Sequence, residues 1–168
     1  MLLYKSSVRS HLDFAILFWS SMCMKLVKQI EGVQRTAAKQ IPEMKRDLAY
    51  AERLQKVKLP MVGYRWIRGD MIEIHKIMIG IYDKDTFGFL KLWKDVAPRT
   101  GTRGHPFKLY PHKARTSLRK NLFALRVVNT WNSLPTNVAT SKTMNTSKIG
   151  VISTGQTKNY ILMTLRSR

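Results

Sequence analysis

The stretch of residues 64–82 limits most strongly what this chain can fold into. Its apolar side chains recur at spacings of three and four residues, which is the period of one helix face. The members of this row are Tyr64, Ile67, Met71, Ile74, Met78 and Ile81. Ile72 and Ile79 form a second apolar row beside it, Arg65 falls on the far side, and Pro60 precedes the stretch. A helix that is apolar on more than one side must be covered on more than one side. The pattern therefore predicts a central helix.

Further helices are predicted on both sides of the central one. The same periodicity is found over residues 4–20, 25–41, 48–57 and 123–134. In the second of these segments the predicted apolar stripe consists of Leu26, Ile30, Val33, Ala37 and Ile41. The first segment is apolar on both faces although it starts almost at the first residue. We therefore expect the chain to be a piece of something longer, whose preceding part would cover that helix.

The remaining segments predict the overall division of the chain. Gly and Pro interrupt residues 83–106, which indicates an irregular connection. Phe107 and Leu109 alternate with Lys108 before Pro111, as in a short strand. The sequence predicts a mainly α fold: a bundle of four to five helices with a short β element and a weakly ordered C-terminal tail. The expected regions are 1–82 (helical), 83–106 (linker), 107–137 (basic) and 138–168 (tail).

The charge of the chain is its most unusual property and points to its partners. The sequence has 30 Lys and Arg against 10 Asp and Glu, a formal net charge of +20. Every acidic residue lies at or before Asp95, so residues 96–168 contain 13 Lys and Arg and no carboxylate side chain. An excess of this size favours an anionic partner, above all nucleic acid.

Two groups of basic residues are candidates for contacting phosphates. Lys28, Arg35 and Lys39 recur on one side of the predicted helix over 25–41, where a solvated face and a binding face fit equally well. The second group follows the predicted strand, where no carboxylate is close in sequence, and we favour it. Its members are Lys108, Lys113, Arg115, Arg119, Lys120 and Arg126.

Signatures of catalysis and of bound cofactors are missing from the sequence. It has no GxxxxGK[ST], GxGxxG, HExxH or GxSxG motif, and its single cysteine, Cys23, excludes an internal disulfide. None of the histidines has companions at metal-ligand spacing, and we expect His75 to be structural. Asp83 and Asp85 suit a turn better than a magnesium site. We therefore expect no metal, no cofactor, no small-molecule substrate and no catalysis by this chain.

Aromatic and apolar residues leave two further questions. Trp66 and Trp131 have the chemistry to stack on bases, but their places on helical faces favour the core.

No apolar run reaches the roughly 20 residues of a transmembrane helix, so we expect no membrane association. The basic, Ser-containing N-terminal segment leaves a mitochondrial presequence open as a minor alternative to a nuclear or cytoplasmic location.

Several blocks of the sequence together resemble one known family. They are SSVRSHLDFAILFWS (6–20), IEGVQRTAAKQIPEM (30–44), AYAERLQKVKLPMVGYRWIRGDMIEIHKIMIGIYD (49–83), TRGHPFKLY (102–110) and FALRVVNTWNSLP (123–135). In this order and at this spacing, over roughly 6–137, they resemble the region after the palm in reverse transcriptases of non-LTR (LINE-type) retrotransposons, of the jockey-like and chicken-repeat-like branch. Trp66 departs from the family pattern, where Arg is usual, and so does everything after Thr140.

The resemblance implies a thumb and the region downstream of it, which in that family help to grip template and primer. The catalytic aspartates of the palm have no counterpart here, so no polymerase residue is carried over. Lys28, Arg35 and Lys39 would belong to the thumb-like helices, and Arg65 and Arg68 to the YRWIRGD block. The hypothesis is a palm-less fragment of an RNA-directed DNA polymerase that retains sequence-nonspecific binding to RNA or DNA. The alternatives are a helical protein-interaction module and a non-functional relic.

Overall fold

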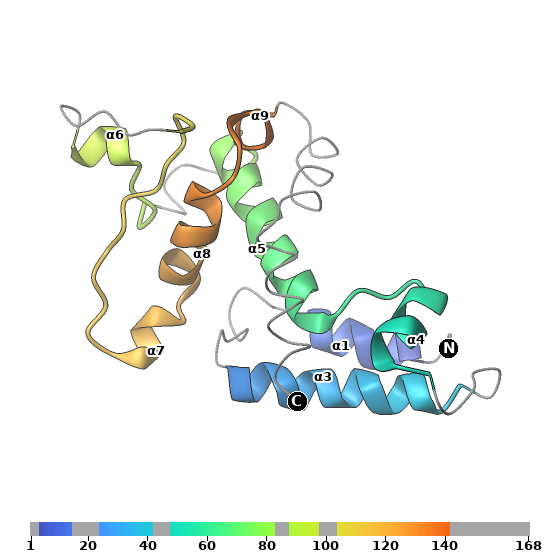
Figure 1. The fold of residues 1–168 in the computed structure, drawn as a ribbon. Helices are drawn as coiled ribbons and strands as arrows, with labels where there is room; N and C mark the ends of the chain where they lie inside the picture. The colour runs from blue at the N-terminus through green and yellow to red at the C-terminus, as the bar shows by residue number, and fades with distance from the viewer. Residues whose placement is uncertain (1–3, 15–23, 42–47, 83–87, 98–103, 142–168) are drawn as a thin grey trace.

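The computed structural model describes residues 4–14, 24–41, 48–82, 88–97 and 104–141, and within them the fold is mainly helical, as predicted (Figure 1). A single π-helical turn, Tyr4–Val8, continues directly into α1 (Arg9–Asp13). The other helices are α3 (Met24–Lys39), α4 (Tyr50–Lys56), α5 (Val62–Met78), α6 (Trp93–Val96), α7 (Ser117–Lys120), α8 (Phe123–Asn132) and α9 (Thr136–Ala139).

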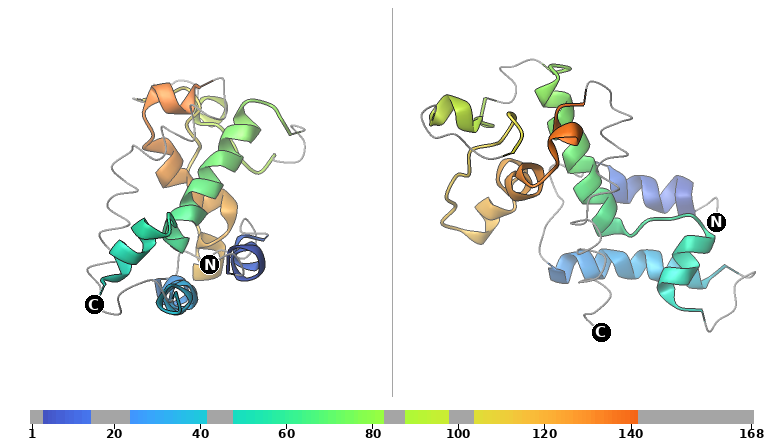
Figure 2. Two further views of the ribbon diagram at one scale, coloured as in Figure 1. Left: turned by 90° about the vertical axis from the view of Figure 1, so that its right-hand side faces the viewer. Right: turned by 45° about the horizontal axis from the view of Figure 1, so that its top comes forward.

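Helix α5 joins the two halves of the fold. Its first turns lie on the layer of α1, α3 and α4, and its last turns lie beside α8 and α9 (Figures 1 and 2). Met71 and Ile74 are fully buried in its middle, so the predicted central stripe is confirmed there. The prediction is wrong for Ile81, which is exposed beyond the end of the helix.

A glycine explains why α5 ends before the apolar pattern does. Gly80 adopts a φ of 75°, a left-handed conformation that side chains rarely tolerate. Its N–H donates to the Ile77 carbonyl at 3.2 Å, and the Ile81 N–H donates to the Lys76 carbonyl at 3.0 Å. These two bonds form a Schellman motif, which satisfies the last carbonyls and turns the chain away from the helix axis.

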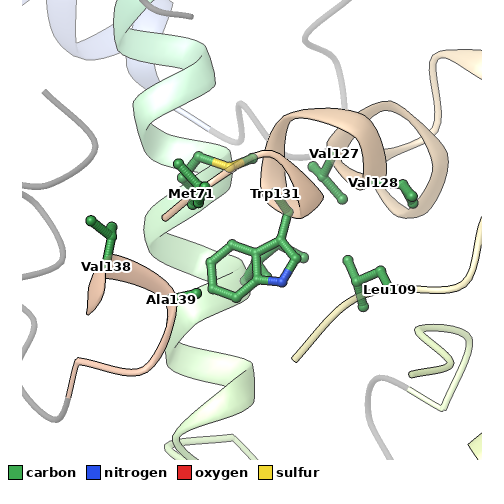
Figure 3. Packing of buried hydrophobic residues seen from close by; sticks show 9 residues of the cluster. Met71, Leu109, Val127, Val128, Trp131, Val138 and Ala139 are labelled. Atoms are coloured by element: carbon green, nitrogen blue, oxygen red, sulfur yellow. The ribbon is translucent and has the colours of Figure 1, made fainter. Parts of the chain in front are cut away.

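The larger hydrophobic core lies between the second half of α5 and α8, with Trp131 at its centre (Figure 3). The Trp131 side chain is fully buried, and its indole N–H donates to the Phe107 carbonyl at 2.8 Å. Around it pack Met71, Ile74, Leu109, Val127, Val128, Leu134, Val138 and Ala139. The predicted face of α8 is confirmed, and Trp131 is a core residue.

The face that α3 buries differs from the predicted one. Val27, Glu31, Gln34 and Ala38 are buried, whereas Leu26 and Val33 of the predicted stripe are exposed. The reason is a buried polar network. The Glu31 carboxylate accepts from the Tyr50 hydroxyl and, at 2.8 Å, from the Val62 N–H at the start of α5. Gln34 donates to the Pro60 carbonyl at 3.1 Å and accepts from the Tyr4 hydroxyl at 2.9 Å.

The N-terminal helix is shorter than predicted. Phe14 is extended, with a ψ of 132°, so α1 ends at Asp13. Val8 and Phe14 are both exposed, so the described residues do not cover both faces of this helix. Residues 15–20, the rest of the predicted helix, lie outside the described part of the chain.

The predicted β element is present as a single antiparallel bridge between Leu92 and Leu109. The Trp93 N–H donates to the Lys108 carbonyl and the Tyr110 N–H to the Lys91 carbonyl, both at 2.8 Å. The partner residue, Leu92, falls within the irregular connection predicted for residues 83–106, because the sequence around it has no strand pattern. Leu109 is buried by the pairing, and this attaches the segment to the core.

A buried ion pair also joins α5 to α8. The Arg126 guanidinium donates to both carboxylate oxygens of Asp70, at 2.8 and 2.9 Å, and the side chains are only 2% and 5% exposed, respectively. Burial raises the pKa of the Asp70 carboxyl, and the hydrogen bond and charge of Arg126 oppose that rise. Such a pair fixes the register of two helices because either charge alone would be costly to bury.

The packed chain continues slightly past the expected start of the tail at residue 138. Val138 and Ala139 belong to the main core, and Ser141 is buried against α5. The Ser141 carbonyl and hydroxyl lie 2.8 and 3.0 Å from Nε2 of His75, which is fully buried. His75 is therefore structural, as expected. Residues 142–168, which hold the rest of the predicted tail, lie outside the described residues.

Removing the Trp131 side chain should strongly destabilise the protein. Trp131→Ala should lower the free energy of unfolding by about 3–5 kcal/mol, because it opens a cavity and removes the bond to Phe107. Denaturant titration followed by circular dichroism measures this loss. Leu118→Ala is the matched control: Leu118 is 78% exposed, so its truncation should change stability by about 0.5 kcal/mol or less. A loss below about 1 kcal/mol for Trp131→Ala would contradict its place in the core.

Removing one charge of the buried Asp70–Arg126 pair should cost more stability than removing both. Arg126→Met should cost about 3–5 kcal/mol, because it leaves the Asp70 carboxylate buried without its partner. The double variant Asp70→Leu/Arg126→Met should recover most of that loss in the same titration. Lys76→Met is the control, because the Lys76–Glu73 pair is partly exposed, at 29% and 20%, and should be worth about 1 kcal/mol or less. Equal losses in the single and double variants would refute this account.

Candidate nucleic-acid interface

The segment of residues 111–120 is a basic surface between two anchored ends. It leaves the core after Leu109, runs along the left side of the molecule in Figure 1, and ends in α7. Its exposed cations are Lys113, Arg115, Arg119 and Lys120. None of the four forms an ion pair with any described residue, and none has an acidic residue near it in sequence. Their charges therefore face solvent without a counter-charge from these parts of the chain.

The first anchor of this segment is made by the end of α8. The Asn132 side chain accepts from the Leu109 N–H and donates to the Leu109 carbonyl, both at 2.8 Å. This two-bond contact copies the pairing of a neighbouring strand, and it satisfies both backbone groups of a buried residue. Together with the Trp131–Phe107 bond, it fixes where the basic segment begins.

The second anchor is the junction of α7 and α8. The Thr116 hydroxyl accepts from the Arg119 N–H at 3.3 Å, which caps the single turn of α7. The Arg126 guanidinium, already paired with Asp70, also donates to the Asn121 carbonyl at 3.0 Å. The exposed cations are thus carried by a segment that is held to the same core at both ends.

Lys108 differs from the other members of its predicted group. It is half-buried, and its side chain passes over Gly104, where a Cβ atom would lie 2.8 Å from Lys108 Cε. Gly104 also has a φ of 112°, a backbone conformation that favours glycine. Lys108 therefore belongs to a packed turn as well as to the basic surface.

The structure confirms that Lys28, Arg35 and Lys39 are exposed on α3. Because the buried face is centred on Glu31 and Gln34, these residues lie on a flank of the helix, about 90° from the buried face at 100° per residue, and not opposite it. The Arg35 guanidinium lies 4.9 Å from the centre of the Tyr50 ring, a cation–π contact that holds it against α4. Helix α3, which carries this group, lies along the bottom of Figure 1, and the segment that carries the other group runs along the left side.

Two predicted interface residues are not surface residues. Arg126 is enclosed in the pair with Asp70, so its assignment to the interface is wrong. Arg65 was expected on the far side of the central helix, but its side chain is buried, because α5 is covered on that side too. Arg68 is half-buried beside Tyr64, whose pKa is raised by burial and lowered by the Arg68 charge. The YRWIRGD block therefore serves packing more than binding.

The two tryptophans considered for base stacking, Trp66 and Trp131, are both buried, which confirms the core assignment. A different set of rings is accessible. The Trp93 and Tyr110 ring centres lie 5.3 Å apart, and those of Tyr110 and His112 lie 5.4 Å apart. This set is not among the residues expected from the sequence. The two-residue spacing of Lys108, Tyr110 and His112 is a signal for one face of an extended segment.

Two expectations from the sequence concern metal sites. No three His, Cys, Asp or Glu side chains among the described residues are grouped as metal ligands would be. His105 is buried against Trp131, with Nε2 at 3.1 Å from the Trp131 carbonyl, and burial lowers the pKa of its imidazole. Asp83 and Asp85, the pair considered for magnesium, lie outside the described residues.

No helix in the parts of the chain that the structure describes has both the length and the apolar character needed to cross a bilayer. Comparison with known proteins adds no assignment: no family model matches the sequence, and neither a curated protein nor a solved structure matches it.

Proposed function

We propose that this chain binds nucleic acid without sequence preference, through phosphate contacts made by the segment of residues 111–120. The observation that carries the proposal is the exposed group of Lys113, Arg115, Arg119 and Lys120, which forms no ion pair with a described residue and is held to the core at both ends. Lys and Arg side chains presented in this way neutralise phosphates and release bound counterions. Since phosphates are the same in every sequence, binding of this kind is nonspecific.

We further propose that the chain derives from the thumb and post-palm region of a LINE-type reverse transcriptase and binds RNA or DNA inside the cell, in the nucleus or cytoplasm. The blocks that carry the resemblance contact one another in the fold, which supports the proposal. Asp70 of the block at residues 49–83 pairs with Arg126 of the block at residues 123–135. Trp131 and Asn132 of the same block hold the FKLY segment. As a fragment without a palm, the chain would grip nucleic acid and not copy it.

A second candidate function is a helical protein-interaction module. The observation that favours it is the exposed apolar pair Leu26 and Val33, which lie two turns apart on one side of α3. This patch is small, and the basic segment lies on other elements. We therefore rank protein interaction second and use variants of α3 as controls for the first proposal.

Binding should depend steeply on salt and on the basic segment. The affinity for duplex DNA should fall by roughly 0.9 log units per log unit of salt for each phosphate neutralised. The triple variant Arg115→Gln/Arg119→Gln/Lys120→Gln should weaken binding to all sequences alike. It should also reduce the slope of log affinity against log salt concentration by the contribution of about three phosphates. Fluorescence anisotropy with two unrelated duplexes, at two salt concentrations, measures both effects.

The matched control is the triple variant Lys28→Gln/Arg35→Gln/Lys39→Gln, which removes the same number of charges from α3. It should keep most of the affinity and of the slope. If the α3 variant loses the slope and the first variant does not, the interface lies on α3. If the parent protein shows no salt-dependent binding, the proposal fails and protein interaction becomes the leading function.

A further inference from the structure

The antiparallel bridge at Leu92 and Leu109 creates a two-sided ribbon. Side chains of paired residues point to the same side, and their neighbours in sequence point to the other side. Leu92 and Leu109 face the core around Trp131. The opposite side, which we call the outer face, is therefore formed by Lys91, Trp93, Lys108 and Tyr110, with His112 continuing the alternation.

The aromatic residues of the outer face are not core residues. Trp93, Tyr110 and His112 belong to none of the hydrophobic clusters within the described residues. Trp93 and Tyr110 are half-buried, and His112 is exposed. The rings meet at interplanar angles of 47° and 72°, so they form a row of adjacent rings and not one closed parallel stack. Aromatic rings in such a row have the geometry to take a further planar group by stacking.

We propose that the outer face stacks the unpaired bases of a single-stranded nucleic acid whose phosphates follow the basic segment. The inference rests on the proposed function and adds the form of nucleic acid that binds. The aromatic row runs directly into the basic segment, because His112 is followed at once by Lys113 and Arg115. Rings that hold bases, next to cations that hold the backbone, are the arrangement by which proteins bind single strands without sequence preference.

Charge favours a nucleic acid over a protein as the occupant of this face. Lys91, Lys94 and Lys113 are exposed around the row, and Lys108 lies on it. Asp95 on α6 is the only carboxylate among the described residues of 88–97 and 104–141. Stacking also requires open bases, because a duplex hides their flat surfaces. The outer face therefore selects single strands, and the exposed cations of the basic segment also bind duplexes.

The test compares single-stranded and duplex probes for the full chain and three variants. The variants are Trp93→Leu, Tyr110→Leu and His112→Ala. The probes are labelled oligothymidylate, oligouridylate and a duplex of equal length, in low salt. Each variant should lose roughly 5- to 100-fold in affinity for the single strands and keep the parent's affinity for the duplex. Comparing thymidylate with uridylate then distinguishes DNA from RNA as the strand that this face prefers.

The matched control is Phe14→Leu, which removes an aromatic ring that is 76% exposed, directly after α1. Helix α1 lies at the other end of the molecule from α6 (Figure 1). It should bind all probes as the parent does. A second readout is independent of affinity. Trp66 and Trp131 are buried, and Trp19 lies outside the described residues. Stacking at Trp93 should quench part of the protein's fluorescence, and the loss of that part in Trp93→Phe identifies Trp93 as the quenched residue.

The outcomes separate this inference from the proposed function. Salt-dependent binding that Arg115, Arg119 and Lys120 support, with unchanged single-strand affinity in all three aromatic variants, overturns base stacking and leaves phosphate binding in place. No binding by the parent overturns both. If Trp93→Leu or Tyr110→Leu does not fold, His112→Ala, at an exposed position outside the core, and the fluorescence test decide. An unchanged affinity there, without quenching in the parent, overturns the inference.

Discussion

Two consecutive residues at the end of α8 organise the half of the molecule that carries the candidate interface. Trp131 fills the core and donates to the Phe107 carbonyl, and Asn132 pairs with both backbone groups of Leu109. The end of α8 takes the place of a neighbouring strand for the segment at Leu109. A single bridge supplies too few hydrogen bonds to keep that segment extended. Without this contact neither the basic segment nor the aromatic row would have a fixed origin.

The distribution of charge follows from what the acidic residues do inside the fold. Glu31 is buried under the start of α5, and Asp70 is buried against Arg126. Glu73 is paired with Lys76 and accepts a hydrogen bond from the Tyr82 hydroxyl at 2.7 Å. Carboxylates engaged in this way do not neutralise a distant surface. The acid-free segment therefore keeps its positive charge at the surface, where Lys113, Arg115, Arg119 and Lys120 are exposed.

Helix positions could be predicted well from the chain, but helix faces only in part. The predicted central stripe is confirmed at Met71 and Ile74, because its apolar side chains have few alternatives to burial. On α3 the apolar stripe and the buried face disagree, because Glu31 and Gln34 find hydrogen-bond partners on α4, on the π-helical turn and at the start of α5. Such partners lie 16 to 31 residues away. A local period contains no information about them.

Local chemistry along the chain is enough to predict the helical class, a short extended segment at Leu109, and the acid-free basic region. Each of these follows from backbone preference, apolar period or charge count, which act over a few residues. Packing decided which cations stay at the surface. The sequence predicted Arg126 and Arg65 as interface residues, but both side chains are buried, and Arg126 is paired with Asp70. The aromatic row likewise needs Lys91 and Tyr110 to meet across the bridge. Contacts between residues far apart in sequence form only when the core closes, and burial then changes a charge from a binding group into a structural one.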